Sequence, residues 1–193
     1  MTARVPRKAG QPGLASVGVT QLGADWVTGP DGVPFRRGAR VILLDEHDRV
    51  LMVRGHDVDD PGRHWWFTVV GGIDPVESEV GAAARELMEE TGLTIDRAVL
   101  VGPVATRTAT FDFARQTVRQ DEWFFVGRIH DPAPVVTDGW TDVERAFMDE
   151  IRWWDLDYLA AVGEQVYPEG FVDLVRDLLM GWDGVVRRLP DGE

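Results

Sequence analysis

Three glutamates stand close together in the stretch 71–93, GGIDPVESEVGAAARELMEETGL. Glu86, Glu89 and Glu90 have the spacing 0, +3 and +4, so a helix would place their carboxylates on one surface, where they repel one another. Glu89 and Glu90 would also lie in the last turn, where the helix dipole disfavours negative charge. Bound Mg²⁺ or Mn²⁺ would remove both penalties, because hard cations prefer carboxylate oxygens. An exposed acidic surface is the alternative, and these residues alone leave both open.

The predicted helix runs from about Val76 to Thr91 and ends at Gly92 as its C-terminal cap. By the 3.6-residue period, the face expected to pack on a sheet holds Val80, Ala84 and Leu87. Ala82 and Ala83 are expected on the acidic side, where small side chains would leave room for a ligand. Upstream, the glycine pair Gly71–Gly72 would let a backbone carbonyl come close to a metal or a phosphate.

The same stretch resembles the Nudix signature, G-x5-E-x7-R-E-U-x-E-E-x-G-U, where U is a bulky apolar residue. Every defined position matches, namely Gly71, Glu77, Arg85, Glu86, Leu87, Glu89, Glu90, Gly92 and Leu93. At typical residue frequencies, a chance match anywhere in the chain is on the order of one in ten million. The order of expected strands and helices over about 36–181 is also similar to a Nudix domain.

The resemblance implies a metal-dependent hydrolase that cleaves the pyrophosphate bond of a nucleoside diphosphate joined to another moiety. Substrates of this kind include nucleoside triphosphates, ADP-ribose, nucleotide sugars and dinucleoside polyphosphates, and the sequence does not choose among them. Glu86, Glu89 and Glu90 would hold Mg²⁺ or Mn²⁺, with the Gly71 carbonyl as a further ligand. Glu77 would pair with Arg85 and fix the loop against the helix. A nucleotide-sensing module without catalysis is the alternative, and the three intact glutamates count against it.

Family members differ in the residue that acts as general base. The candidate inside the signature is Glu86, and the candidates outside it are Glu122, Glu144 and Glu150. Each of the outside acids also fits a plain surface position. Glu150 is slightly favoured, because it precedes the segment RWW near the place where the family can put this residue.

Several residues near the signature are candidates for substrate contact. Gly71 and Gly72 lie at the site, and Arg54 ends a strand where the family often has a cation that contacts phosphate. Trp66 leads into the site and could stack on a nucleobase, although aromatic residues in strands more often belong to the core. His56 and His64 flank a loop, and we expect them to be solvated and without a role.

Two positions depart from the usual family pattern. Val69–Val70 stand where many members have Pro-Gly, and Val76 stands where glycine is frequent. Valine does not readily take a positive φ, so the turn that enters the site is expected to differ. Neither departure removes a carboxylate.

Composition limits the other function classes. The 193 residues carry a net charge of −13, which disfavours nucleic-acid partners and remains compatible with a small phosphorylated substrate bound as a metal complex. The chain has no cysteine, which excludes disulfides, thiolate metal sites and cysteine nucleophiles. No stretch is apolar enough to span a membrane or resembles a signal peptide, so a cytoplasmic location is expected. The sequence does not fix the oligomeric state, although homodimers are common in the family that the chain resembles.

Strand and helix patterns predict one α/β/α sandwich with a mixed central sheet. Strands are expected at about 39–45, 50–55, 65–70, 98–111, 117–129 and 149–156, with 130–142 as a long loop. Helices are expected after Asp155 and from Gly170 to Trp182. We predict an N-terminal segment over 1–35, in which roughly the first dozen residues form a flexible tail and the rest form a short structured lead-in around Trp26. A hydrolase domain is expected over 36–185 and a C-terminal tail over 186–193.

Overall fold

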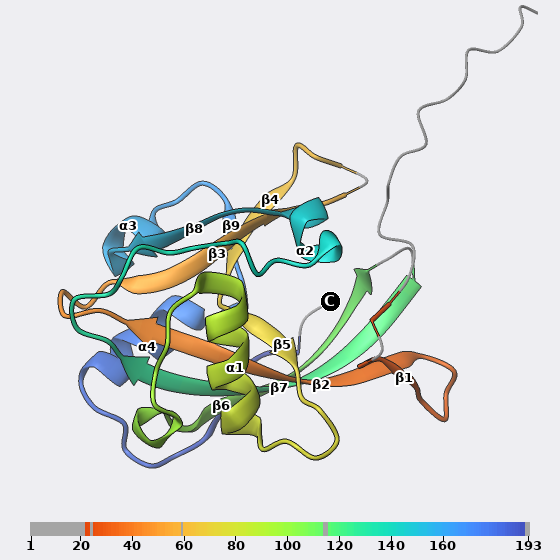
Figure 1. Cartoon of the computed structure of the whole chain (residues 1–193), viewed down its shortest axis with the longest axis horizontal. Helices are drawn as coiled ribbons and strands as arrows, with labels where there is room; N and C mark the ends of the chain where they lie inside the picture. Colours follow the sequence, from red (N-terminus) through yellow and green to blue (C-terminus); the bar gives the residue numbers. More distant parts are fainter. Residues whose placement is uncertain (1–21, 24, 59, 114–115, 192–193) are drawn as a thin grey trace, which may run out of the picture.

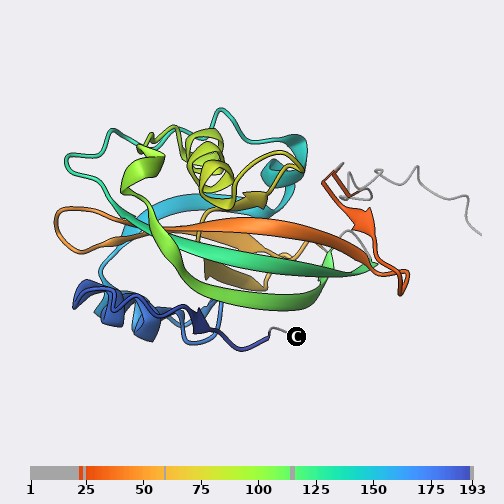
Figure 2. The ribbon, with the colours of Figure 1, turned by 90° about the horizontal axis from the view of Figure 1, so that it is seen from below.

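A curled mixed sheet lies between helices in the computed structural model, which describes residues 22–23, 25–58, 60–113 and 116–191 (Figure 1). The flexible tail expected for the first dozen residues lies outside the described part. Figure 2 shows α1 (Glu79–Thr91) on one face of the sheet and α4 (Phe171–Leu179) on the other. The predicted α/β/α sandwich is confirmed.

The strands, in chain order, are β1 (Val27–Thr28), β2 (Pro34–Leu44), β3 (Val50–His56), β4 (His64–Phe67), β5 (Val70–Gly72), β6 (Val101–Phe113), β7 (Gln116–Arg128), β8 (Met148–Trp154), β9 (Gln165–Val166) and β10 (Arg187–Arg188). The remaining helical elements are η1 (Arg97–Val99), α2 (Asp142–Phe147) and α3 (Leu156–Ala160). The main path of the sheet is β10-β6-β7-β2-β3-β4-β9, and β1, β5 and β8 pair at its sides. The long central strand β2 runs parallel to β7 and antiparallel to β5, so the sheet is mixed.

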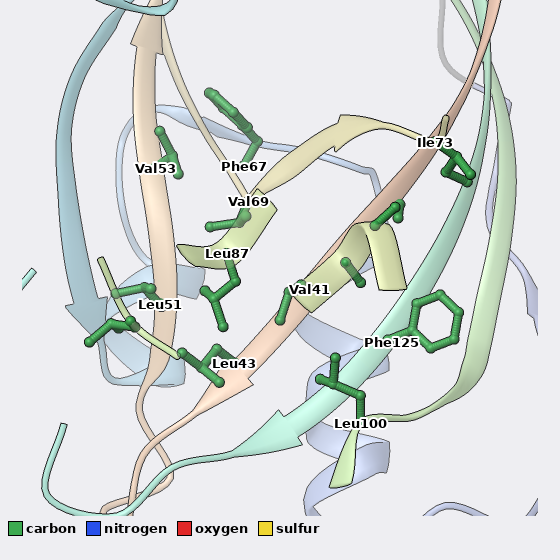
Figure 3. Close-up of a cluster of buried hydrophobic side chains, with 14 of the residues drawn as sticks. Val41, Leu43, Leu51, Val53, Phe67, Val69, Ile73, Leu87, Leu100 and Phe125 are labelled. Carbon is green, nitrogen blue, oxygen red and sulfur yellow. The ribbon is translucent and has the colours of Figure 1, made fainter. Parts of the chain in front are cut away.

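The core between α1 and the sheet combines small and branched side chains with the aromatic rings of Phe67 and Phe125. Leu87 of α1 packs with Val41, Leu43 and other buried side chains of the strands (Figure 3). Burying a leucine of this kind stabilises the fold by about 1.5–3 kcal/mol. Val80 and Ala84 pack against the same cluster, as the helical period predicts.

Ala82 and Ala83 also belong to this core, and both are 0% exposed. The prediction that they lie beside the acids and leave room for a ligand is therefore wrong. Their small side chains instead let the helix lie close against the sheet over a broad face. The glutamates are held at the edge of a tightly packed surface.

Both ends of α1 are capped by local signals. The Ser78 hydroxyl accepts a hydrogen bond from the Gly81 amide at 3.2 Å, so the helix begins at Glu79 and not near Val76, which is 99% exposed. At the other end Gly92 has φ 71°, and its amide donates to the Met88 carbonyl at 2.9 Å. The predicted C-terminal cap is confirmed, and the predicted start was early by about one turn.

The strand expected over 65–70 is divided in two because the chain changes its partner. β4 pairs with β3, whereas β5 pairs with β2. Between them Val69 is buried in the core, and its carbonyl accepts from the Val41 amide at 3.1 Å. Among the described non-glycine residues, Asp48 and Asp131 have positive φ. Val69 and Val70 therefore lead into the site without adopting a positive φ. This change of partner brings Gly71 and Gly72 beneath α1.

Two further segments differ from the sequence prediction. The end of the loop expected over 130–142 leads into α2, whose start is fixed by a capping box between Thr141 and Glu144. The segment expected as a C-terminal tail contains β10, which pairs in parallel with β6. Leu189 after β10 is buried in the cluster beneath α4, and this apolar contact explains why the segment is ordered.

The lead-in segment before β2, expected around Trp26, packs on the sheet. The Trp26 ring lies 6.4 Å from the Phe113 ring, and the Arg36 guanidinium lies 4.6 Å above the Trp26 ring centre. Asp25 accepts a hydrogen bond from Arg36 at 2.8 Å. A Cβ atom at Gly72 would lie 2.5 Å from an Asp25 oxygen, so the glycine is needed for this contact.

Among the helices of the described part, none is long and apolar enough to cross a membrane.

Candidate active site

Gly71 lets a glutamate of α1 rest directly on β5. A Cβ atom at position 71 would lie 1.7 Å from the Glu86 carboxyl carbon, so every other residue would displace that carboxylate. The glycine is required here by close approach, since its φ is not in the left-handed region. The Gly71 backbone and the Glu86 carboxylate therefore form one surface.

The three glutamates Glu86, Glu89 and Glu90 of the Nudix signature, or Nudix box, are called the box glutamates here. Glu90 lies deepest of the three and is 3% exposed. One of its oxygens, Oε2, has no hydrogen-bond partner among the residues that the structure describes. Burial raises the pKa of Glu90 well above its usual range, and the charges of Glu144 and Glu86 add to this rise. A backbone hydrogen bond from Val70 and the charge of Arg40 act in the opposite direction. An unpaired, buried carboxylate oxygen needs a compensating cation or a proton.

Glu86 and Glu89 continue this acidic surface toward solvent. Burial raises the pKa of Glu86, and the charges of Glu89 and Glu144 contribute, whereas Arg85 lowers it. Glu89 is about half exposed and accepts a hydrogen bond from Arg85 at 3.0 Å. The three carboxylates thus share one surface and differ in depth.

A fourth carboxylate reaches this surface from α2. Glu144 is close enough to raise the pKa of both Glu86 and Glu90 by repulsion. The loop before α2 is fixed on the end of α1, where the Trp140 indole donates to the Glu90 carbonyl at 2.9 Å. A Cβ atom at Gly139 would lie 2.1 Å from the Glu89 carbonyl oxygen, so the loop packs directly on the helix.

Arg85 is the cation that organises the box. Its guanidinium donates to Glu77 at 2.9 and 3.2 Å, to the Gly72 carbonyl at 2.8 Å, and to Glu86 at 2.7 Å. These bonds raise the pKa of Arg85 and lower that of Glu77, chiefly through the hydrogen bonds between the two side chains. The predicted Glu77–Arg85 pair is present, and it ties the loop, β5 and α1 together.

The donor set fits a hard divalent cation. Glu86, Glu89, Glu90 and Glu144 offer four carboxylates. The Arg85 guanidinium bonds Glu86 and Glu89, and it also bonds Glu77, so its single positive charge is shared among three carboxylates. The unpaired Oε2 of Glu90 points to the same conclusion. Oxygen ligands of this kind suit Mg²⁺ or Mn²⁺ better than softer metals.

Arg54 and Glu150 lie elsewhere on the sheet. They face each other across β3 and β8, and Arg54 donates to Glu164 at 2.9 Å. The Glu164 hydrogen bond raises the pKa of Arg54, with smaller contributions from Asp149 and Glu150. Glu150 therefore lies opposite Arg54, which has a carboxylate partner in Glu164, whereas the charge that acts on Glu86 and Glu90 from outside α1 is that of Glu144.

Two other candidates are buried in the fold. Trp66 is 2% exposed and packs edge-on against Trp154 at 4.9 Å between ring centres, in the core beneath α4. Glu122 is buried in an ion pair, in which Arg40 donates to its carboxylate at 2.5 Å. Both side chains are therefore enclosed in the fold, with 2% of Trp66 and 1% of Glu122 exposed.

The sequence did not predict how Glu144 is positioned relative to α1. The only local signal is the capping box in TDVE, residues 141–144, which predicts a helix start but not what lies beside it. The position of Glu144 depends on the packing of the preceding loop against α1.

Comparisons with known proteins agree with this fold and site. The NUDIX domain family model matches residues 34–172. An RNA pyrophosphohydrolase from Bartonella bacilliformis is 24% identical over 145 residues, covering 67% of this chain and 83% of the relative. An oxidized purine nucleoside triphosphate hydrolase from Danio rerio is 27% identical over 155 residues, covering 72% of this chain and 95% of the relative.

The solved structures show the same fold. A NUDIX hydrolase from Nitrosomonas europaea superimposes with a TM-score of 0.54 at 18% identity, covering 76% of this chain and 90% of the other. Together with the complete signature over residues 71–93, the family match over most of the chain identifies the protein as a pyrophosphohydrolase that belongs to the Nudix family.

Proposed function

We propose that the protein is a metal-dependent hydrolase of the pyrophosphate bond in a nucleoside diphosphate linked to another moiety, and that water attacks phosphorus. The observation that carries this proposal is the buried carboxylate of Glu90, which has an unpaired oxygen beside Glu86 and Glu144. A chain that did not bind a cation here would gain nothing from keeping these like charges together.

Glu86, Glu89 and Glu90 would hold Mg²⁺ or Mn²⁺ with the Gly71 carbonyl. The bound ion would neutralise charge on the phosphate oxygens and orient the substrate. Arg85 would act as a positioning residue, because its bonds to Glu77 and the Gly72 carbonyl keep Glu86 and Glu89 in place. The protein then supplies position and electrostatic stabilisation more than covalent chemistry.

We assign the general base to Glu144, which would take a proton from the attacking water. It approaches the box glutamates from a separate element, α2, and its position is fixed by the capping box. Glu150 faces Arg54, and Glu86 lies against Gly71 and Arg85. Glu144 is thus the outside acid best placed for this role.

Glu144→Gln is expected to lower kcat by about a hundredfold or more, because a general base contributes roughly 10²–10⁴. Glutamine preserves the capping box, so the fold should be retained. Glu150→Gln, which removes the alternative acid, is expected to have a much smaller effect. Steady-state rates of both variants decide the assignment, and a larger loss in Glu150→Gln would refute it.

The substrate class is tested by a hydrolysis panel with Mg²⁺ and with Mn²⁺. The panel contains nucleoside triphosphates (oxidised ones included), ADP-ribose, nucleotide sugars and dinucleoside polyphosphates. Curated relatives named RNA pyrophosphohydrolase add an RNA that carries a pyrophosphate bond. The charge of −13 favours the small substrates, because an extended RNA would be repelled by most of the surface.

Glu89→Gln is the control for this panel. Glu89 is half exposed, so its loss should leave the fold intact and lower turnover by about a hundredfold through weaker metal binding. Metal-dependent cleavage of one class, lost in the variant, supports the proposal and names the substrate. Near-normal turnover in Glu89→Gln would remove it from the metal site, and binding without cleavage by the wild type would favour the sensing module.

A further inference from the structure

Two histidines and an aspartate converge on neighbouring strands away from the box glutamates. His56 of β3 and His64 of β4 are a cross-strand pair. Their Nδ1 atoms lie 2.9 and 3.1 Å from Oδ1 and Oδ2 of Asp149, which belongs to β8. The three side chains are partly exposed, and the candidate ligand atoms all lie within 4.8 Å of one another.

A β-bulge gives Asp149 its orientation. β3 and β8 pair Arg54 with Glu150 and Gly55 with Met148, so Asp149 is the extra residue between two paired positions. Bulges of this kind re-aim a side chain that regular alternation would send elsewhere. Here the bulge directs the carboxylate to the histidine pair, and ligands on paired strands are held more precisely than ligands on loops.

The surrounding charges leave the cluster able to accept a cation. Arg54 lies 3.8 Å from Asp149, which would oppose cation binding if the arginine were unpaired. The Arg54 guanidinium is, however, bound by both oxygens of Glu164. With neutral histidines, Asp149, Arg54 and Glu164 together carry one net negative charge, because the arginine is offset by one of the two acids.

We propose that His56, His64 and Asp149 form a transition-metal site for an ion of the Zn²⁺ class. Imidazole nitrogens with one carboxylate suit Zn²⁺, whereas the all-oxygen set of α1 suits Mg²⁺. Ligands about 2.1 Å from a tetrahedral ion lie roughly 3.4 Å apart. This value lies between the two His–Asp149 distances, 2.9 and 3.1 Å, and the 4.8 Å within which all candidate ligand atoms lie. Three protein ligands leave a fourth position for water.

Such an ion would join three strands at one point. It would fasten the loop end of the β3–β4 hairpin to the start of β8, directly after α2. The set shares no residue with Glu86, Glu89, Glu90 and Glu144, so the two metal sites are chemically and genetically separable.

The test uses Co²⁺ as a coloured substitute for Zn²⁺. Full-length protein freed of metal by a chelator is titrated with Co²⁺ in millimolar Mg²⁺, which occupies the carboxylate site, and visible absorption is recorded. Displacement by Zn²⁺ then gives the Zn²⁺ affinity. We expect one Co²⁺ per chain with the intense absorption of a tetrahedral site. Absence of this signal in the wild-type protein would overturn the proposal.

Variants assign the signal to its ligands. His56→Gln and His64→Gln keep an N–H donor for Asp149 but remove a metal ligand, so each should fold and lose at least about a hundredfold in Zn²⁺ affinity. His47→Gln, at an exposed histidine, is the matched control and should bind as the wild type does. Glu90→Gln should also retain the absorption. If the signal survives in both cluster variants, or is lost in Glu90→Gln, the ion binds elsewhere and the proposal fails.

Discussion

Replacing Glu90 by glutamine is expected to lower turnover by about a thousandfold while making the metal-free protein more stable. The loss of activity follows because Glu90 is the most buried of the box carboxylates, and several kcal/mol of charge stabilisation depend on the ion it would hold. The gain in stability follows because the variant removes a charge that is buried beside Glu86 and Glu144. We expect a gain of about 1 kcal/mol near neutral pH without metal.

The pH dependence of this gain has a definite sign. The folded state raises the pKa of Glu90 above its unfolded value, so the folded chain binds the extra proton. Protonation of Glu90 in the folded state therefore contributes to the free energy of unfolding. This contribution is fully present below the unfolded pKa of about 4.3 and is lost as pH rises through the folded pKa. The difference between Glu90→Gln and wild type should therefore grow with pH above this value.

Urea unfolding of both proteins at several pH values, with a chelator and then with Mg²⁺, measures the effect. Mg²⁺ should stabilise the wild type more than the variant, because binding to the folded state shifts the equilibrium. A variant that is less stable than the wild type in the chelator would contradict the account of Glu90.

The second large effect is expected on stability, from the buried ion pair of Arg40 and Glu122. Arg40 donates to Glu122 at 2.5 Å, Gln120 donates to the same oxygen at 2.7 Å, and Arg107 lies 3.6 Å from the other oxygen. Burial lowers the pKa of Arg107, and Glu122 opposes this effect. Glu122→Gln would leave two buried guanidinium groups without a countercharge and should cost about 3–5 kcal/mol.

A double-mutant cycle with Arg40→Met isolates the pair. Removing both charges should cost less than the sum of the single changes, because the double variant no longer leaves Arg40 buried and unpaired. Asp157→Asn is the control, since it breaks the exposed ion pair with Arg176 and should change the free energy of unfolding far less. Additive single effects at Arg40 and Glu122 would show that the pair is not coupled.

The sequence predicted those parts of the site that lie within one helix and the loop before it. The spacing of Glu86, Glu89 and Glu90 and the cap at Gly92 are properties of consecutive residues, and α1 has them as expected. The helical period alone did not place Ala82 and Ala83, because it does not say how wide a face the sheet will cover. That width depends on the shape of the core.

Contacts between distant segments could not be predicted in the same way. Glu144 reaches the box through a loop that packs on α1, and Asp149 meets His56 and His64 only because of a bulge. The histidines, which we expected to be solvated and without a role, bond the same carboxylate. Strand register decides such contacts, and it depends on pairing energies spread over the whole sheet.

The packing at the two ends of the described chain determines which residues a shortened gene must encode for the fold and the site to be kept. The family match ends at residue 172, inside α4, whose Leu174, Val175 and Leu178 are buried with Leu189 near β10. It begins at residue 34, after Asp25, which bonds Arg36 and rests on Gly72. A clone limited to the matched region would expose an apolar sheet face and would lose the carboxylate that rests behind the site's glycine pair.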